Sequence, residues 1–280
     1  MRKNKIISGL YILLLISLMS SCTEEIDLKL NEGNTRLVVE GCITTDTIQQ
    51  KVMLTKSTSY FYGESAPVIS GAKVKISTGN QLYEFSEVPP QSGIYYSDLP
   101  FSGKQNETYD LVITNVDLNA DGNLQSYFAS EKMKNYLVID SIYAQEINYH
   151  GKQGYMIFGF AQEPPTKDDY YMWRYYVNGQ LITDTMNKIT FASDQLINGN
   201  YLKDFQMGFI EEANTGDTLL VETNSITEDY FNYIISFFLE TEWSSGSFGG
   251  PPANINTNIN NGAVGYFNTE ARTKISLVLP

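Results

Sequence analysis

Residues 72–85 decide the fold of this chain, and they read Ala72-Lys73-Val74-Lys75-Ile76-Ser77-Thr78-Gly79-Asn80-Gln81-Leu82-Tyr83-Glu84-Phe85. Ala72, Val74 and Ile76 alternate with polar residues, and successive side chains of a strand point to opposite faces of its sheet. The alternation therefore predicts a strand with one buried face. Gly79-Asn80 is typical of a tight turn. The stretch predicts a β-hairpin whose second strand is Leu82–Phe85.

Short segments of the same kind lie on both sides of this hairpin. With it, the predicted strands are Arg36–Ile43, Lys51–Lys56, Ala72–Ser77, Leu82–Phe85, Gly93–Ser97 and Thr108–Thr114. Six or seven short strands in about 100 residues are typical of an immunoglobulin-like β-sandwich. We therefore expect residues 36–134 to form such a domain, which ends at the polar connector Lys132–Asn135.

The remaining residues, 135–280, predict a second β-rich domain with one amphipathic helix. Its predicted strands are Leu137–Tyr149, Gly154–Gln162, Tyr170–Val177, Gln180–Thr185, Asp217–Thr223, Val264–Phe267 and Thr273–Leu279. Asn178-Gly179 predicts a hairpin turn. Ser225-Ile226-Thr227-Glu228 has the pattern of a capping box, in which serine and glutamate close the first helical turn. Apolar residues then recur at three- and four-residue steps, which predicts a helix over 226–242 packed on a sheet.

Asp117-Leu118-Asn119-Ala120-Asp121-Gly122 begins like a calcium-binding loop. The twelfth position of that pattern is Phe128 instead of a bidentate glutamate, and no helices are expected beside it. The alternative is a polar hairpin loop in which aspartate and asparagine stabilise the turn. The sequence leaves both interpretations open.

The N-terminus, residues 1–21, has the pattern of a signal peptide. Arg2, Lys3 and Lys5 precede the apolar run Ile6–Met19. At about 1.5 Å per residue this run is too short to cross the ~30 Å hydrocarbon core of a bilayer. Small residues and then Cys22 follow, as at a bacterial lipoprotein cleavage site. We expect removal of the leader and acylation of Cys22, and the alternative is ordinary secretory cleavage that leaves a free thiol.

Residues 22–35 predict a polar tether behind the lipidated cysteine. The segment Thr23-Glu24-Glu25-Ile26-Asp27 places acidic residues directly after Cys22. It resembles the signal that sends lipoproteins of Bacteroidota to the outer face of the outer membrane. A solvated acidic tether without that meaning is the alternative. We therefore expect a lipid-anchored protein of the outer membrane that faces the cell exterior.

Composition excludes several classes of function. The formal net charge is −13, and the predicted leader carries only basic charges, so the mature chain is more acidic still. An acidic surface argues against binding to nucleic acid or to anionic lipid. With Cys22 acylated, Cys42 has no partner for an intramolecular disulfide, and we expect it to be a small buried apolar side chain.

Several segments resemble one known family. They are Cys22–Leu28, Leu37–Gly41, Gly71–Val74, Asp140–Ile142 and, most specifically, Pro251–Ile259 with Asn261–Phe267. These residues resemble the Bacteroidota outer-membrane lipoproteins catalogued as domain of unknown function 4249. The resemblance covers nearly the whole chain after the leader. It implies an outer-membrane location and association with TonB-dependent transporters, and it implies no catalytic residues because no activity is established for the family.

A second resemblance concerns O-glycosylation. Four Asp-Ser/Thr-apolar triplets resemble the acceptor sequence of these bacteria, and their acceptor residues are Thr47, Ser141, Thr185 and Thr218. The alternative is that Asp-Thr begins a strand after a turn. Glycans on extracellular loops would add bulk and solubility to those surfaces.

The sequence favours binding over catalysis. It contains no nucleophile elbow, no His/Cys metal set and no phosphate loop. Adjacent carboxylates such as Asp168-Asp169 and Glu211-Glu212 point to opposite faces if they lie in strands. We therefore expect a non-enzymatic protein without cofactor that helps a TonB-dependent transporter to capture a ligand. The alternative is a free-standing glycan-binding or adhesion lipoprotein whose aromatic residues, Tyr60–Tyr62, Tyr170–Trp173 or Trp243, stack on sugars.

Overall fold

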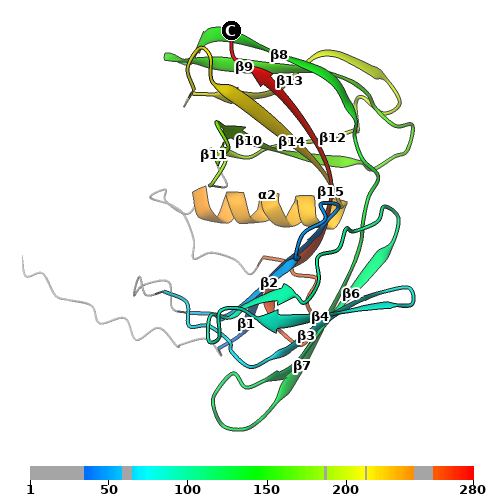
Figure 1. The fold of residues 1–280 in the computed structure, drawn as a ribbon, viewed down its shortest axis with the longest axis vertical. Coiled ribbons are helices and arrows are strands. Elements are labelled where there is room, and N and C mark those ends of the chain that lie inside the picture. The colour runs from blue at the N-terminus through cyan, green and yellow to red at the C-terminus, as the bar shows by residue number, and fades with distance from the viewer. Residues whose placement is uncertain (1–34, 59–64, 186–187, 212, 243–254) are drawn as a thin grey trace, which may run out of the picture. The chain divides into compact units, whose positions relative to one another are not determined.

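The computed structural model describes residues 35–58, 65–185, 188–211, 213–242 and 255–280 (Figure 1). Within them the fold is mainly β, with β-sandwich packing and a single helix, as expected from the sequence. The elements are β1 (Leu37–Thr44), β2 (Lys51–Lys56), β3 (Lys73–Thr78), β4 (Gln81–Glu87), β5 (Ile94–Ser97), β6 (Thr108–Val116), β7 (Gln125–Lys132), β8 (Ile139–Tyr149), β9 (Lys152–Gln162), β10 (Tyr170–Val177), β11 (Gln180–Leu181), β12 (Thr190–Ser193), β13 (Tyr201–Ile210), β14 (Thr218–Ile226), α2 (Glu228–Glu242) and β15 (Val264–Val278).

The strands form two sheets. Twelve strands belong to one sheet in the order β11-β10-β14-β15-β1-β2-β5-β4-β3-β6-β7, with β12 paired to β10. The other sheet has the order β13-β9-β8. Both predicted two-residue turns are confirmed: β3 and β4 join through Gly79-Asn80, and β10 and β11 join through Asn178-Gly179. Asn178 and Gly179 both have positive φ, as this kind of turn requires.

The strand β15 connects the two halves of the large sheet. It pairs in parallel with β1, with Val39 opposite Gly265, and antiparallel with β14, with Leu219 opposite Leu277. The two closing strands expected from the sequence, 264–267 and 273–279, are therefore one continuous strand of 15 residues. Because β15 pairs directly with β1, the expected boundary at residues 134 and 135 does not separate two sheets (Figure 1).

Three groups of buried apolar side chains hold this arrangement. The first lies among β1–β7 and includes Leu37, Leu54, Ile76 and Leu111. The second lies between the three-stranded sheet and the strands β10, β14 and β15, so two sheets pack face to face there. The third joins β10 and β14 to the helix α2.

The helix begins two residues later than the sequence pattern predicts. Ser225 and Ile226 are the last residues of β14, and the Ser225 hydroxyl accepts a hydrogen bond from the Leu137 amide at 3.1 Å. The cap is Thr227, whose hydroxyl accepts the Tyr230 amide at 3.3 Å. The predicted Ser225 capping box is therefore wrong, because pairing with β10 retains Ser225 in the sheet. No helix in the described ranges is long and apolar enough to cross a membrane.

Candidate functional site

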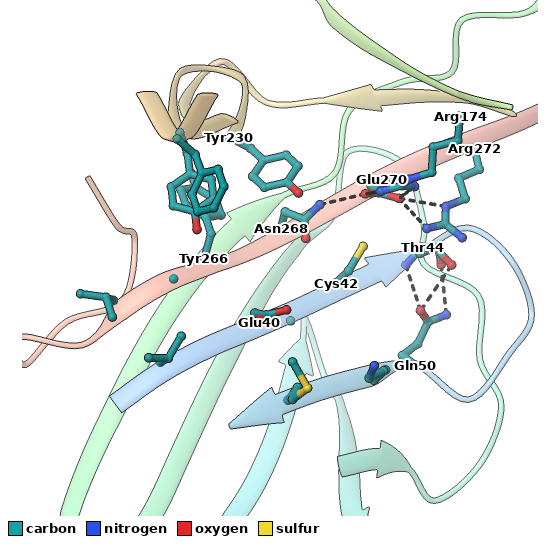
Figure 2. A pocket seen from close by; sticks show the side chains of 18 of the residues that line it. Glu40, Cys42, Thr44, Gln50, Arg174, Tyr230, Tyr266, Asn268, Glu270 and Arg272 are labelled. Carbon is teal, nitrogen blue, oxygen red and sulfur yellow. Dashed lines mark hydrogen bonds and ion pairs between the residues drawn. The ribbon is translucent and has the colours of Figure 1, made fainter. Parts of the chain in front are cut away.

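A cavity of about 760 Å³ lies between α2 and the strands β1, β2 and β15 (Figure 2). Its position follows from the alternation along β1. Leu37, Val39 and Ile43 are fully buried in the first apolar group, so the intervening Val38, Glu40 and Cys42 face the opposite side of the sheet. That side is the floor of the cavity.

One wall of the cavity is aromatic. Tyr230 and Tyr233 of α2 both contact Tyr266 of β15, with ring centroids 5.1 and 5.0 Å apart. Phe237 extends this row along the helix, at 6.4 Å from Tyr233. Large rings of this kind supply apolar contact area together with a polar hydroxyl at one end.

The opposite end of the cavity is built around Glu270, which is 1% exposed. Arg174 donates two hydrogen bonds to its carboxylate, from Nη1 and Nη2, both at 2.8 Å. Arg272 donates from Nη2 at 2.5 Å and from Nε at 3.0 Å (Figure 2). Burial alone would raise the pKa of Glu270, but the two guanidinium groups hold this pKa far below its ordinary value.

The ion pairs continue from Glu270 toward the surface. Glu222 Oε1 lies 3.3 Å from Arg174 Nη1, and Glu222 Oε2 lies 3.6 Å from Lys274 Nζ. Asp46 Oδ2 lies 3.2 Å from Arg272 Nη1 and 2.7 Å from Lys274 Nζ. The network thus contains three carboxylates and three cations and has no formal excess charge. These groups form a rigid polar wall because each charge already has partners.

Cys42 differs from its expected place in the core, since it is half-buried on the cavity floor. Burial is the main cause that raises the pKa of the Cys42 thiol, and the nearby Glu270 charge raises it further. The sulfur therefore stays protonated. Next to it, the buried Gln50 side chain accepts the Thr44 amide at 3.0 Å and donates to the Phe101 carbonyl at 2.8 Å, which fixes this edge of the floor.

Glu40 and Lys51 are the exceptions among the charged residues that line the cavity, since both are exposed and neither has an ion pair in the described part of the chain. The Glu40 carboxylate makes no hydrogen bond within the part of the chain that the structure describes, and it lies over β1 in Figure 2. The cavity therefore offers a bound molecule an aromatic wall, a neutral polar end and one accessible charge of each sign, Glu40 and Lys51.

The four candidate glycosylation sites do not line this cavity, although Thr47 directly precedes Ile48, which does. Cys22 and the tether up to residue 34 lie outside the described residues. The four candidate glycosylation sites are exposed: Thr47 in the turn after β1, Ser141 in β8, Thr185 after β11 and Thr218 at the start of β14. Surface exposure is what a glycan acceptor requires, and the structure does not bring the four together.

The aromatic segments expected to stack on sugars are not surface platforms where the structure describes them. Tyr170, Tyr171, Met172 and Trp173 are each at most 4% exposed, because β10 is covered on both faces. Tyr60–Tyr62 and Trp243 lie outside the described residues. In the pair Asp168-Asp169 the first residue is exposed and the second is buried, so the two carboxylates do not share a face.

The loop that begins at Asp117 uses its carboxylates to stabilise its own backbone. Asp117 accepts the amides of Asp121 and Gly122 at 3.1 and 3.0 Å, and Asp121 accepts the Asn123 amide at 2.9 Å. The loop joins β6 to β7. Its geometry matches the polar hairpin interpretation.

Sequence reasoning missed the charged end of the cavity. Asn268, Glu270 and Arg272 alternate along β15, so they share one face, and this spacing was a usable signal. Arg174 and Glu222 lie directly opposite each other in the β10–β14 register, and no local sequence pattern shows that these two strands pair.

These features define a β-rich protein with a ligand-sized cavity closed by one helix. A family model described as a domain of unknown function, DUF4249, matches residues 23–276, and the chain belongs to this family. No curated protein matches the chain.

Proposed function

We propose that this protein is a cell-surface lipoprotein of the outer membrane that captures a small ligand for a TonB-dependent transporter. The single observation that carries the proposal is the cavity between α2 and the strands β1, β2 and β15. Its volume of about 760 Å³ and its combination of aromatic and convergent polar groups are typical of small-molecule sites.

The state of the charged groups favours binding over catalysis. An acid or base catalyst needs a group that exchanges protons near neutral pH. At this site the pKa of Glu270 lies far below that range and the pKa of Cys42 is raised above its ordinary value. Both side chains are thus fixed in one protonation state, which suits recognition.

The predicted N-terminal lipid supports a place at the membrane. A diacylated or triacylated Cys22 would hold the body permanently, since each buried CH₂ contributes about 0.8 kcal/mol. The match to the family model begins at residue 23, directly after that cysteine.

Affinity purification from gently solubilised outer membranes tests the transporter partnership. We expect the tagged native protein to bring a β-barrel transporter with it. A Cys22→Ala variant is the control, since it keeps the folded body but cannot carry the lipid, and it should recover far less barrel. Recovery of the acylated protein alone would contradict the proposed partnership.

A second candidate, glycan binding, is favoured by one exposed face of the three-stranded sheet. Tyr143 of β8 and Phe158 of β9 stack with centroids 4.9 Å apart and an interplanar angle of 12°, and Tyr143 is 38% exposed. Flat exposed rings can stack on sugars. Binding on a glycan array that Tyr143→Ala abolishes would support this function, and an array without hits would remove it.

A further inference from the structure

Three buried carboxylates that do not line the α2 cavity converge at a second place. Glu163 follows β9, Asp169 directly precedes β10 and Asp194 directly follows β12. They are 0%, 8% and 2% exposed, and one oxygen of each lies within 4.8 Å of the other two. Two backbone hydrogen bonds hold the segments that carry these residues. The Asp194 amide donates to the Asp169 carbonyl at 3.0 Å, and the Glu163 amide donates to the Asn200 carbonyl at 3.1 Å.

The negative charge at this point is not balanced by the described side chains. Lys134 is the one cation paired with the group, with its Nζ 3.3 Å from Asp169 Oδ1. The other contacts come from neutral donors. Glu163 accepts hydrogen bonds from the Tyr171 hydroxyl at 3.0 Å and from the Gly199 amide at 2.5 Å. Asp169 accepts a hydrogen bond from the Thr166 hydroxyl. Three carboxylates against one ammonium leave a formal charge of −2, and burying unpaired charge is strongly unfavourable.

Asp194 provides a second, independent observation. Its Oδ2 is buried and has no hydrogen-bond partner, although buried carboxylate oxygens are almost always hydrogen-bonded or bound to a metal. The Asp194 carboxylate that carries this unpartnered oxygen points into the cluster, since one of its oxygens lies within 4.8 Å of an oxygen of each of the other two residues. An ion at this point would supply the missing partner.

We infer that Glu163, Asp169 and Asp194 bind a divalent cation of the size and hardness of calcium. Calcium takes oxygen ligands at about 2.3–2.6 Å, so oxygens on opposite sides of the ion lie up to about 5 Å apart. The 4.8 Å limit on the three oxygens falls within that span. An all-oxygen, carboxylate-rich set favours calcium or magnesium over zinc or copper, which prefer nitrogen and sulfur.

The ion would connect parts of the two sheets. Glu163 directly follows a strand of the three-stranded sheet, whereas Asp169 and Asp194 adjoin strands of the large sheet. Its role is thus structural: it fixes residues 163–169 against the segment after β12. Removal of the ion should loosen these loops and leave the α2 cavity in place.

Calorimetric titration of calcium chloride into the EDTA-treated full-length protein in detergent tests this inference. We expect one saturable site and, at a hundredfold excess over Kd, a rise in Tm of about 5 °C or more. Asp194→Asn and Glu163→Gln should each weaken binding at least tenfold. Both variants should be no less stable than the wild type in EDTA, because each removes a buried repulsive charge.

Asp117→Asn is the matched control, since it neutralises the one loop with a calcium-like sequence and should leave affinity unchanged. Absence of both heat and Tm shift in the wild type would overturn the inference. So would calcium binding that Asp117→Asn abolishes while Asp194→Asn and Glu163→Gln retain it. Equal weak binding in all variants would identify the sites as exposed acidic residues and would overturn it as well.

Discussion

At the scale of single residues, Glu270 is the side chain on which the polar end of the cavity depends. It is buried in strand β15 and is held by hydrogen bonds from Arg174, Arg272 and Asn268. Removing one partner of a buried ion pair is costly because the remaining charges stay desolvated and unpaired.

Glu270→Gln should therefore lower the free energy of unfolding by about 3–5 kcal/mol, measured by urea denaturation at neutral pH. Glu40→Gln is the matched control in the same cavity, and it should change stability by no more than about 0.5 kcal/mol because Glu40 is exposed and unpaired. Equal effects of the two substitutions would contradict the burial and pairing described for Glu270.

The lowered pKa of Glu270 also predicts a dependence on pH. In the unfolded chain this carboxyl takes up a proton near its ordinary pKa of 4.5, whereas the folded protein keeps it ionised to lower pH. The unfolded state then binds more protons, so the stability contributed by Glu270 is present above pH 4.5 and is lost as pH falls through the folded pKa. Below pH 4.5 the unfolding free energy of Glu270→Gln should vary less steeply with pH than that of the wild type, in urea titrations at a series of pH values.

Gly265 is a second residue whose position in the fold strictly requires glycine. Its φ is +88°, and a Cβ atom there would lie 2.1 Å from the Val39 carbonyl oxygen. Gly265→Ala should cost about 3 kcal/mol or more, through backbone strain and a clash with β1. Gly262→Ala is the control, since Gly262 has a φ of +75° but open space around it, and it should cost only about 1–2 kcal/mol. Urea denaturation that gives similar losses for both would contradict the close β1–β15 approach.

At the scale of elements, the helix α2 shows how tertiary pairing overrides a local signal. The Ser225 pattern predicts a helix from residue 226, but β14 continues to Ile226 because its last residues pair with β10. The apolar stripe was predicted correctly, since Tyr230, Tyr233 and Ile234 face the body of the protein. Propensity and capping patterns are weak against eight residues of sheet pairing.

Thr227→Ala should destabilise α2 by about 1 kcal/mol, because it removes the hydroxyl that caps the first turn. Amide exchange in α2 should become faster, while exchange in β3 and β4 stays unchanged. Ser225→Ala removes only the hydrogen bond to the Leu137 amide and should leave the exchange of α2 amides as it is. Faster exchange of α2 in Ser225→Ala alone would restore the capping-box interpretation.

The strands differ in how well their sequences predict them. Strands with strict alternation or a strong turn, such as β3, β4 and β10, were located closely from sequence. The strand β13 was not expected, because register shifts near Asp204 and Met207 break its alternation, and Asp204 has a φ of +50°. The parallel pairing of β1 with β15 joins residues more than 200 positions apart, and no local pattern contains that information.

At the scale of the whole molecule, sequence and structure supply different parts of the account. The membrane setting remains a prediction from the sequence, which rests on the expected leader, Cys22 and the acidic tether. The cavity exists only after β1, β10, α2 and β15 come together, so its residues could not be grouped by sequence reasoning. The proposed ligand capture depends on both, since the lipid would place the body and the cavity would do the binding.

Native mass spectrometry of the protein purified from the cells that produce it naturally tests ligand capture most directly. We expect the wild type to carry a small-molecule adduct. Val264→Trp, which fills the cavity from β15, should lose that adduct, whereas Val112→Trp, on an exposed position of β6, should retain it. A wild type with no adduct under mild conditions, or an adduct that Val264→Trp retains, would contradict the assignment of this cavity as the binding site.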